Sequence, residues 1–311
     1  MQRLLTGLQS SGDLHIGNYF GALKPFLDLY PKYESLLMVA DYHSLTSLKD
    51  PKKVSGSIYN SVRDYLAAGV DSNKAIIFKQ SDVSEHTELG WIFDCLVTVP
   101  FLQQGHAYKD KIAKGLEANA GLLTYPMLMA ADILLYDTVI VPVGEDQRQH
   151  IEYAREAAAK FNNTYGETFI EPKEHIMTSV GVIPGTDGKK MSKSYGNTIP
   201  LFGTKDEIAK AVMSIVTDSK GESPEHVYNI HALFRKGEAL SSLYKENKGK
   251  YKALKDALVE DIESVIGPMR ERRANISDED VKTVLREGKE KAKTLAAAKM
   301  ADVRKKVGVA L

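Results

Sequence analysis

Short apolar runs bounded by turn residues recur along the first half of the chain, and a longer amphipathic segment lies beside each of them. Runs of this length are typical of buried strands, and the segments between them are typical of helices. The alternation therefore predicts an α/β fold built on a doubly wound parallel sheet. The predicted strands are Arg3–Leu8, Ser35–Ala40, Ala75–Gln80 and Thr138–Val143.

Polar and glycine-containing segments directly follow three of these predicted strands. They cover residues 7–18, 41–44 and 144–147. In a doubly wound sheet, ligands bind at the carboxyl ends of the strands, where the strand order reverses. We therefore expect the functional site to be built from these three segments.

The pattern changes about two thirds of the way along the chain, after which amphipathic helical segments continue to the end. Thr204 and Glu207 have the spacing of a capping box, and Ser277 precedes a second long helical segment. We predict a Rossmann-like sheet domain over residues 1–200 and a helical domain over residues 201–311. The last helix of the second domain can pack back on the first.

Composition restricts the class of protein. Of the 311 residues, 43% are hydrophobic and 26% are charged, which suits one large core or one core with a smaller helical core beside it. The 41 basic and 41 acidic residues balance, so a generally basic nucleic-acid binder is excluded and any RNA contact must be local. The basic stretch Val281–Lys306 is one candidate, although a solvated helix face explains it as well.

Cysteine content and the start of the chain favour a cytoplasmic protein. Cys95 is the only cysteine, which excludes an intrachain disulfide and any metal site built from several thiolates. The first residues lead into a predicted strand rather than a signal peptide. The most apolar stretch, residues 121–136, is interrupted by Pro126 and Asp132, so we expect a buried helix and no membrane span.

A glycine-containing turn follows the first predicted strand and precedes a helix-like segment, Asn18–Tyr30. Free backbone N–H groups at the start of a helix attract phosphate. Gly17 would let a flat adenine lie against bare backbone, because it has no β-carbon. Taken alone, the segment fits a nucleotide site and a plain strand-turn-helix equally well.

A second segment is more specific. Lys190-Met191-Ser192-Lys193-Ser194, called the lysine loop below, is flanked by Gly188 and Gly196. Two lysines on a mobile loop can close on a triphosphate and follow the charge that moves onto the leaving pyrophosphate. A solvated basic loop is the alternative.

Asp13-Leu14-His15-Ile16-Gly17-Asn18 and the lysine loop resemble the two signatures of class I aminoacyl-tRNA synthetases. The first differs from the family's His-Ile-Gly-His in Asn18, a departure that is usual in the tryptophanyl branch. The resemblance implies that His15 and Asn18 bind the ATP phosphates and that Lys190 and Lys193 grip pyrophosphate. Further nucleotide contacts that it implies are Gln9, Ser10, Ser11, Gly17, Met191, Ser192 and Ser194.

An aspartate interrupts the apolar stretch between the two signatures. Pro126 favours the first turn of a helix, which makes Tyr125 the entry residue and places Met129 and Asp132 on one face. A buried carboxylate without a partner is strongly disfavoured, so something must donate a hydrogen bond to Asp132. Donors inside the protein and a bound ligand both remain possible.

The block from residue 121 to residue 150 resembles the tryptophanyl-tRNA synthetase family, and the resemblance covers essentially the full chain. It implies that Asp132 accepts the indole N–H of tryptophan and that Tyr125 and Gln147 hold the α-amino group. Other tryptophan contacts that it implies are Leu5, His43, Met129, Val141 and Val143. On the ATP side it implies Gly144, Glu145, Asp146 and Ile183, with Lys111 assisting at the phosphates.

The resemblance also implies a ligase that acts in two steps. Tryptophan and ATP give tryptophanyl-AMP and pyrophosphate, and tryptophan then passes to tRNA(Trp). Mg²⁺ enters with ATP rather than in a protein cage, the helical domain reads the anticodon, and the enzyme is a homodimer. Two alternatives stay open: a tyrosyl-tRNA synthetase, which would need a polar residue in place of Met129, and a non-catalytic tRNA-binding paralogue.

Overall fold

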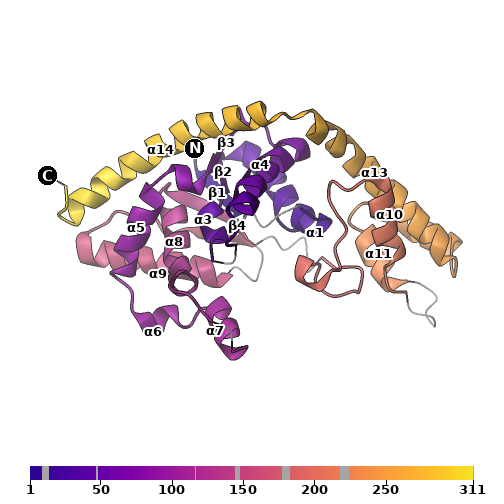
Figure 1. Cartoon of the computed structure of the whole chain (residues 1–311), viewed down its shortest axis with the longest axis horizontal. Helices are drawn as coiled ribbons and strands as arrows, with labels where there is room; N and C mark the ends of the chain where they lie inside the picture. Colours follow the sequence, from indigo (N-terminus) through magenta and orange to yellow (C-terminus); the bar gives the residue numbers. More distant parts are fainter. Residues whose placement is uncertain are drawn as a thin grey trace.

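The computed structural model describes residues 1–8, 14–46, 48–115, 117–143, 148–176, 183–217 and 224–310, with only the backbone described for residues 143 and 174–176. Five parallel strands form one sheet in the order β3-β2-β1-β4-β5 (Figure 1). The strands are β1 (Arg3–Leu8), β2 (Glu34–Val39), β3 (Ala75–Lys79), β4 (Thr138–Val143) and β5 (Lys173–Ile176).

The four strands predicted from the sequence are confirmed to within one residue at each end. The fifth, β5, was not predicted, because its sequence Lys-Glu-His-Ile has neither an apolar run nor an alternating pattern. It pairs with β4 alone and so forms one edge of the sheet. Short, charged edge strands are common, since they discourage pairing with other molecules.

Helices cover both faces of the sheet. Alternate residues of a strand point to opposite faces, and accordingly Leu4 and Leu37 lie in one apolar core whereas Leu5 and Leu36 lie in another. The helices that follow β1 to β4 are α1 (Ile16–Asn18), α2 (Lys24–Leu29), α3 (Asp41–Ser44), α4 (Pro51–Ala68), α5 (Glu85–Asp94), α6 (Val99–Leu102), α7 (His106–Ala113), α8 (Ala120–Leu134) and α9 (Arg148–Tyr165).

From residue 205 onward the regular elements of the described chain are all helices, as the sequence predicted. Both capping predictions are confirmed: Thr204 caps α10 reciprocally with Glu207, and Ser277 caps α14 with Asp280. The helices are α10 (Lys205–Met213), α11 (Glu225–His231), α12 (Glu238–Glu246), α13 (Tyr251–Asn275) and α14 (Asp278–Lys306). No helix among the described residues has the length and apolarity needed to cross a membrane.

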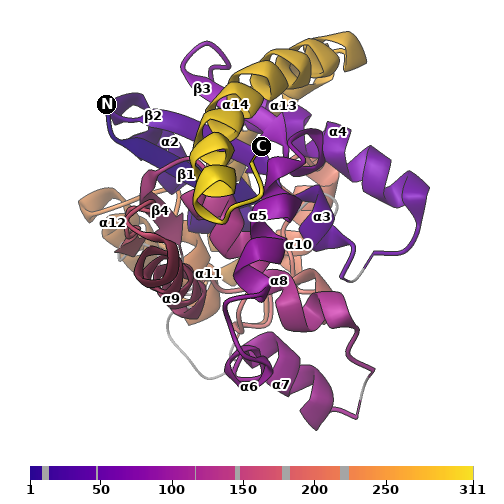
Figure 2. The same cartoon turned by 90° about the vertical axis from the view of Figure 1, so that its left-hand side faces the viewer.

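Helix α14 crosses the edge of the sheet (Figures 1 and 2). Its first turns contribute Val281 and Leu285 to the core on one face, and its later turns contribute Ala292 and Met300 to the core on the other. The last helix thus packs on the sheet part of the chain. The domain boundary between residues 200 and 201 stays a prediction.

Two predicted helices differ in the structure. Helix α8 begins at Ala120, capped by Asn119, whose Oδ1 accepts a hydrogen bond from Leu122 N over 2.9 Å, so Pro126 lies inside the helix rather than in its first turn. The prediction was wrong because an interior proline removes only one backbone hydrogen bond, which the packing of a buried helix can offset.

The helix predicted over Asn18–Tyr30 is divided by a π-helical turn, Tyr19–Leu23, between α1 and α2. Pro25 has no N–H with which to bond the carbonyl four residues earlier. The Lys24 N–H instead bonds the Tyr19 carbonyl, which widens the turn. The proline therefore explains the division.

Candidate functional site

The strand order reverses at β1, because β2 and β3 lie on one side of it and β4 and β5 on the other. The carboxyl ends of β1 and β4 therefore form the switch point at which ligands bind in this type of sheet. The segments that follow these two ends lie outside the described residues, as does the side chain of Val143. These segments contain the predicted site residues Gln9, Ser10, Ser11, Gly144, Glu145, Asp146 and Gln147.

His15 and Asn18 cap each other at the start of α1. The His15 backbone N–H donates to Asn18 Oδ1 over 3.0 Å, and the Asn18 backbone N–H donates to His15 Nδ1 over 3.3 Å. Because Nδ1 accepts, the neutral ring carries its proton on Nε2. Burial and, secondarily, the charge of Lys193 lower the pKa of His15 to about 4. A phosphate here would therefore meet an N–H dipole rather than a full positive charge near pH 7.

The two sequence signatures lie against each other. The Ile16 N–H donates to the Ile199 carbonyl, just beyond the lysine loop, over 3.0 Å. A β-carbon on Gly17 would lie 2.9 Å from His15 Nδ1 and 3.2 Å from Met191 Cβ, which leaves little room for a side chain. Gly17 thus lets the first signature pack directly on the lysine loop, a packing reason beside the adenine contact that the sequence suggested.

Asn197 anchors the base of the lysine loop. It is only 2% exposed, and its Oδ1 accepts from the Ser192 N–H over 2.8 Å. Its Nδ2 donates to the Lys190 carbonyl over 3.1 Å and to Asp187 Oδ1 over 2.7 Å. One buried amide therefore fixes the loop backbone on both sides of Met191.

Side chains of the lysine loop divide into buried and exposed ones. Met191 is buried in the apolar core, as is the nearby Ile183. Lys190, Lys193 and Ser194 are exposed. The loop is thus pinned by its methionine, while its two lysines lie at the surface, where a polyphosphate can reach them.

The predicted tryptophan contacts come from several elements that meet in one core. Leu5 on β1 and Val141 on β4 are buried, and Met129 on α8 is half-buried beside them. Tyr125, also half-buried, lies one helical turn before Met129. The structure therefore places these predicted contacts on one face of the sheet, beside β1 and β4.

Asp132 on α8 is 2% exposed, and three side chains donate hydrogen bonds to it. Oδ1 accepts from Gln80 Nε2 over 2.8 Å and from His86 Nδ1 over 2.6 Å, and Oδ2 accepts from His43 Nε2 over 2.8 Å. Burial raises the pKa of Asp132, but the hydrogen bonds and charges of both histidines outweigh it and lower the pKa to about 2. The carboxylate is ionised near neutral pH, and the internal donors that the sequence left open are present.

Tyr125 lies between two histidines. Its hydroxyl is 2.7 Å from His150 Nε2, and its ring meets the His43 ring edge-on, with centroids 6.2 Å apart. His43 therefore contacts both Tyr125 and Asp132, two other residues of the predicted tryptophan site. Its position near the substrate stays a prediction. His150 belongs to α9, the helix that follows β4.

No hydrogen bond or ion pair joins Lys111 to this group in the described part of the chain. It is half-buried on α7, which projects below α8 and α9 in Figure 1. Its proposed assistance at the phosphates stays a prediction.

Sequence reasoning missed Gln80, His86, His150 and Asn197. Gln80 ends a predicted strand, so the rule that ligands bind at carboxyl ends could have found it. Asn197 follows a glycine whose φ is +64°, which marks the end of the loop. No pattern in one sequence shows that His86 and His150 face inward.

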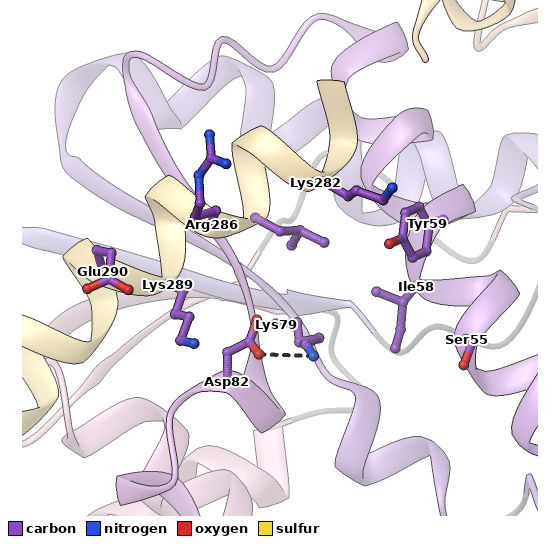
Figure 3. A pocket seen from close by; sticks show the side chains of 10 residues that line it. Ser55, Ile58, Tyr59, Lys79, Asp82, Lys282, Arg286, Lys289 and Glu290 are labelled. Atoms are coloured by element: carbon purple, nitrogen blue, oxygen red, sulfur yellow. Dashed lines mark ion pairs between the residues drawn. The ribbon is translucent and has the colours of Figure 1, made fainter. Parts of the chain in front are cut away.

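A separate cleft of about 360 Å³ lies between α4, the end of β3 and α14 (Figure 3). None of the predicted site residues lines it. An ion pair of 2.9 Å between Lys79 and Asp82 lies in it. The charged residues of the lining are Lys79, Asp82, Lys282, Arg286, Lys289 and Glu290, of which four are basic. Within the described residues, no group of three or more His, Cys, Asp or Glu side chains could hold a metal ion.

Comparison with known proteins finds a matching family and several similar proteins. Residues 1–291 match the family of tRNA synthetases class I (W and Y). The chain is 48% identical to a tryptophan–tRNA ligase of Fusobacterium nucleatum, covering 99% of this chain and 98% of that protein, and 42% identical to one of Rhodopirellula baltica, covering 99% of each. It also resembles the crystal structure of tryptophanyl-tRNA synthetase from Campylobacter jejuni complexed with ADP and tryptophan, with a TM-score of 0.91, 41% identity and coverage of 99% and 100%.

Proposed function

Because this chain belongs to the family of class I tRNA synthetases for tryptophan and tyrosine, we propose that it is a tryptophan–tRNA ligase. The observation that carries the choice of amino acid is Asp132, an ionised carboxylate on α8. The same helix packs its apolar side chains, Met129 among them, into the core that contains Leu5 and Val141. A side chain that is apolar except for one N–H donor fits such a place, because the donor bonds the carboxylate while the ring contacts the apolar side chains. The indole of tryptophan is a side chain of this kind. A tyrosyl enzyme would need a polar group where this chain has Met129.

The first step joins tryptophan to ATP. The tryptophan carboxylate is already ionised near neutral pH, so its oxygen can attack the α-phosphorus without a general base, and pyrophosphate leaves. Catalysis then depends on positioning and on stabilising charge. His15 donates a hydrogen bond from Nε2 to the ATP phosphates. Lys190 and Lys193 reach the pyrophosphate from the exposed side of the lysine loop. We propose that Mg²⁺ arrives bound to the ATP phosphates.

In the second step a ribose hydroxyl at the end of tRNA(Trp) attacks the activated carbonyl, and AMP leaves. The chain has no net charge, so the RNA contact must be local. We assign anticodon contacts to the helical part, residues 201–311. The cytoplasm, where tRNA is charged, is the proposed location.

A second copy of the chain is the proposed partner in a homodimer. The largest exposed apolar side chain is Trp91, at 69%, and Val99 and Ile112 are 56% and 52% exposed. They lie on α5, α6 and α7, which follow one another along the chain. A dimer interface at these helices would remove the three side chains from solvent. Trp91→Asp should yield monomers in sedimentation velocity, whereas an unchanged oligomer would contradict this surface.

Pyrophosphate exchange into ATP, measured with tryptophan, tyrosine and phenylalanine separately, tests the function directly. Exchange that depends on tryptophan alone supports the proposal. Exchange with tyrosine identifies the tyrosyl enzyme. No exchange with any of the three identifies a non-catalytic paralogue, which the exposed lysines of the loop argue against.

A further inference from the structure

Asp132 is held by buried side chains that extend beyond its immediate contacts. Gln80, His86 and Tyr136 are all 0% exposed. His86 bridges two of the group, because its Nδ1 lies 2.6 Å from Asp132 Oδ1 and its Nε2 lies 2.8 Å from the Tyr136 hydroxyl. Its ring also stacks on Phe78, with centroids 6.0 Å apart. These three side chains, called the relay below, thus hold the carboxylate and have no contact with solvent.

The hydrogen-bond partners determine where the protons lie. An ionised carboxylate can only accept, so His86 Nδ1 carries the proton that it donates to Asp132. In the neutral imidazole Nε2 then accepts, and the Tyr136 hydroxyl donates to it. Burial and, secondarily, the charge of Asp132 raise the pKa of Tyr136, so its hydroxyl stays protonated. The amide of Gln80 is oriented in the same way, because its Oε1 accepts from the Tyr42 N–H over 3.2 Å and leaves Nε2 to face Asp132.

The two oxygens of Asp132 are not equivalent. A carboxylate offers about two acceptor positions on each oxygen. Oδ1 accepts from both Gln80 and His86 and is therefore filled. Oδ2 accepts only from His43 among the described residues, so it alone retains an acceptor position.

We propose that His86, held by the Tyr136 hydroxyl, is a specificity-determining positioning residue, which with Gln80 fills Oδ1 of Asp132 and presents Oδ2 as a single acceptor. The inference rests on the proposed function, in which that acceptor receives the indole N–H. A phenol hydroxyl could also donate to Oδ2, but the His43 N–H is already engaged and, among the described residues that hold Asp132, leaves no donor for the phenol's own lone pairs. The arrangement therefore favours a group that donates a hydrogen bond and accepts none, and the indole N–H is such a group.

The test combines two variants with two substrates in the pyrophosphate exchange assay. His86→Leu removes the donor, and His86→Asn keeps an N–H near the position of Nδ1. The substrates are tryptophan and its analogue in which sulfur replaces the indole N–H. The ratio of their kcat/KM values measures recognition of the N–H, whereas a general folding defect lowers both values together.

We expect His86→Leu to lower kcat/KM for tryptophan about tenfold or more, the usual effect of losing a hydrogen bond to a charged group, and to leave the value for the sulfur analogue nearly unchanged. The KM for ATP should not change, and His86→Asn should restore most of the ratio. Equal losses for both substrates, or no loss for either, would overturn the inference.

Tyr136→Phe tests the same hydrogen bonds if His86→Leu does not fold. It leaves the His86 ring in place but removes the hydroxyl that fixes its proton on Nδ1, so the substrate ratio should fall in the same direction by a smaller factor. An unchanged ratio overturns the relay. The wild-type arm separates the two hypotheses: wild type that activates tyrosine refutes the proposed function, whereas wild type specific for tryptophan with an unaffected variant refutes only the role of His86.

Discussion

Gly288 of α14 lies directly on the backbone of Ile77 in β3, where a β-carbon on the glycine would lie 1.7 Å from the Ile77 carbonyl oxygen. Strand β3 forms one edge of the sheet. The helix therefore covers backbone groups that could otherwise pair with another chain. This contact also joins the last helix of the chain to the part that contains the candidate site.

Gly288→Ala should destabilise the protein, because the new methyl group meets backbone that cannot rotate away. We expect a loss of about 1–3 kcal/mol in the free energy of unfolding, as for overpacked sites, measured by chemical denaturation. Gly267→Ala is the matched control, since its β-carbon would lie an ordinary 3.7 Å from the Glu263 carboxylate. That change should stabilise helix α13 by about 0.5–1 kcal/mol. Equal stabilities of the two variants would contradict the close contact.

Asp94 should make stability fall as pH rises through the acid range. Its Oδ1 is buried without a hydrogen-bond partner among the described residues, and burial raises the pKa of Asp94 from 3.8 to about 6. Between these values the folded protein binds more protons than the unfolded chain, so this group favours folding at low pH and ceases to do so above pH 6. Asp94→Asn should raise stability at pH 7 and reduce the slope between pH 4 and 6. An unchanged slope would show that the carboxylate is paired.

The sequence predicted the elements with strong patterns and missed those that depend on contacts. Four strands carry apolar runs and were found, whereas β5 is recognisable only by its pairing with β4. The start of α8 was misplaced because Pro126 has a strong preference for first turns, which burial overrides. Tertiary packing decides such cases.

The candidate site shows the same division. Asp132 was found because a carboxylate in an apolar stripe is conspicuous, but two of its donors were not, since Gln80 and His86 reach it from other elements. The lysine loop was found from its sequence motif. Asn197, which anchors the loop, lies beyond the end of that motif and was missed. Single-sequence patterns reveal unusual residues and not the partners that hold them.

Lys190→Ala and Lys193→Ala should slow adenylate formation while leaving the affinity for tryptophan unchanged. Both side chains are exposed on the loop whose base Asn197 holds, so their removal should not disturb the core. Loss of one preorganised charge typically costs about a hundredfold or more in rate. Single-turnover formation of tryptophanyl-AMP gives the rate, and equilibrium dialysis gives the tryptophan affinity. A change confined to tryptophan affinity would refute the assignment.

Lys289→Glu should weaken tRNA binding without affecting amino-acid activation. Lys289 lines the basic cleft between α4 and α14 (Figure 3), on the same edge of the sheet as the end of β3. We propose that Lys289 contacts a tRNA phosphate, so reversing its charge should raise the KM for tRNA about tenfold and reduce the dependence of binding on salt. Lys293→Glu, exposed on the same helix but outside the cleft, is the control. Equal effects of both variants, or none, would show that the cleft does not contact RNA.

Asp132→Asn and Asp132→Ala should both abolish most tryptophan activation, while ATP still binds. Both remove the charged acceptor proposed for the indole N–H, and the alanine variant also leaves the donors of His43, Gln80 and His86 unpaired. Sites built on such a hydrogen bond reject analogues without the donor by roughly ten-thousandfold, so discrimination against phenylalanine should collapse along with activity.

The asparagine variant separates recognition from folding, because it keeps the shape of the side chain and one acceptor oxygen. It should fold, bind ATP with wild-type affinity in calorimetry, and lose at least about a hundredfold in kcat/KM for tryptophan, since a neutral amide is a weaker acceptor than a carboxylate and one of its two heavy atoms now donates. The loss should be the same at pH 5 and pH 8, because the wild-type carboxyl, with a pKa of about 2, is ionised at both. An asparagine variant that keeps full discrimination for tryptophan would make Asp132 a structural residue and move the recognition of the indole elsewhere.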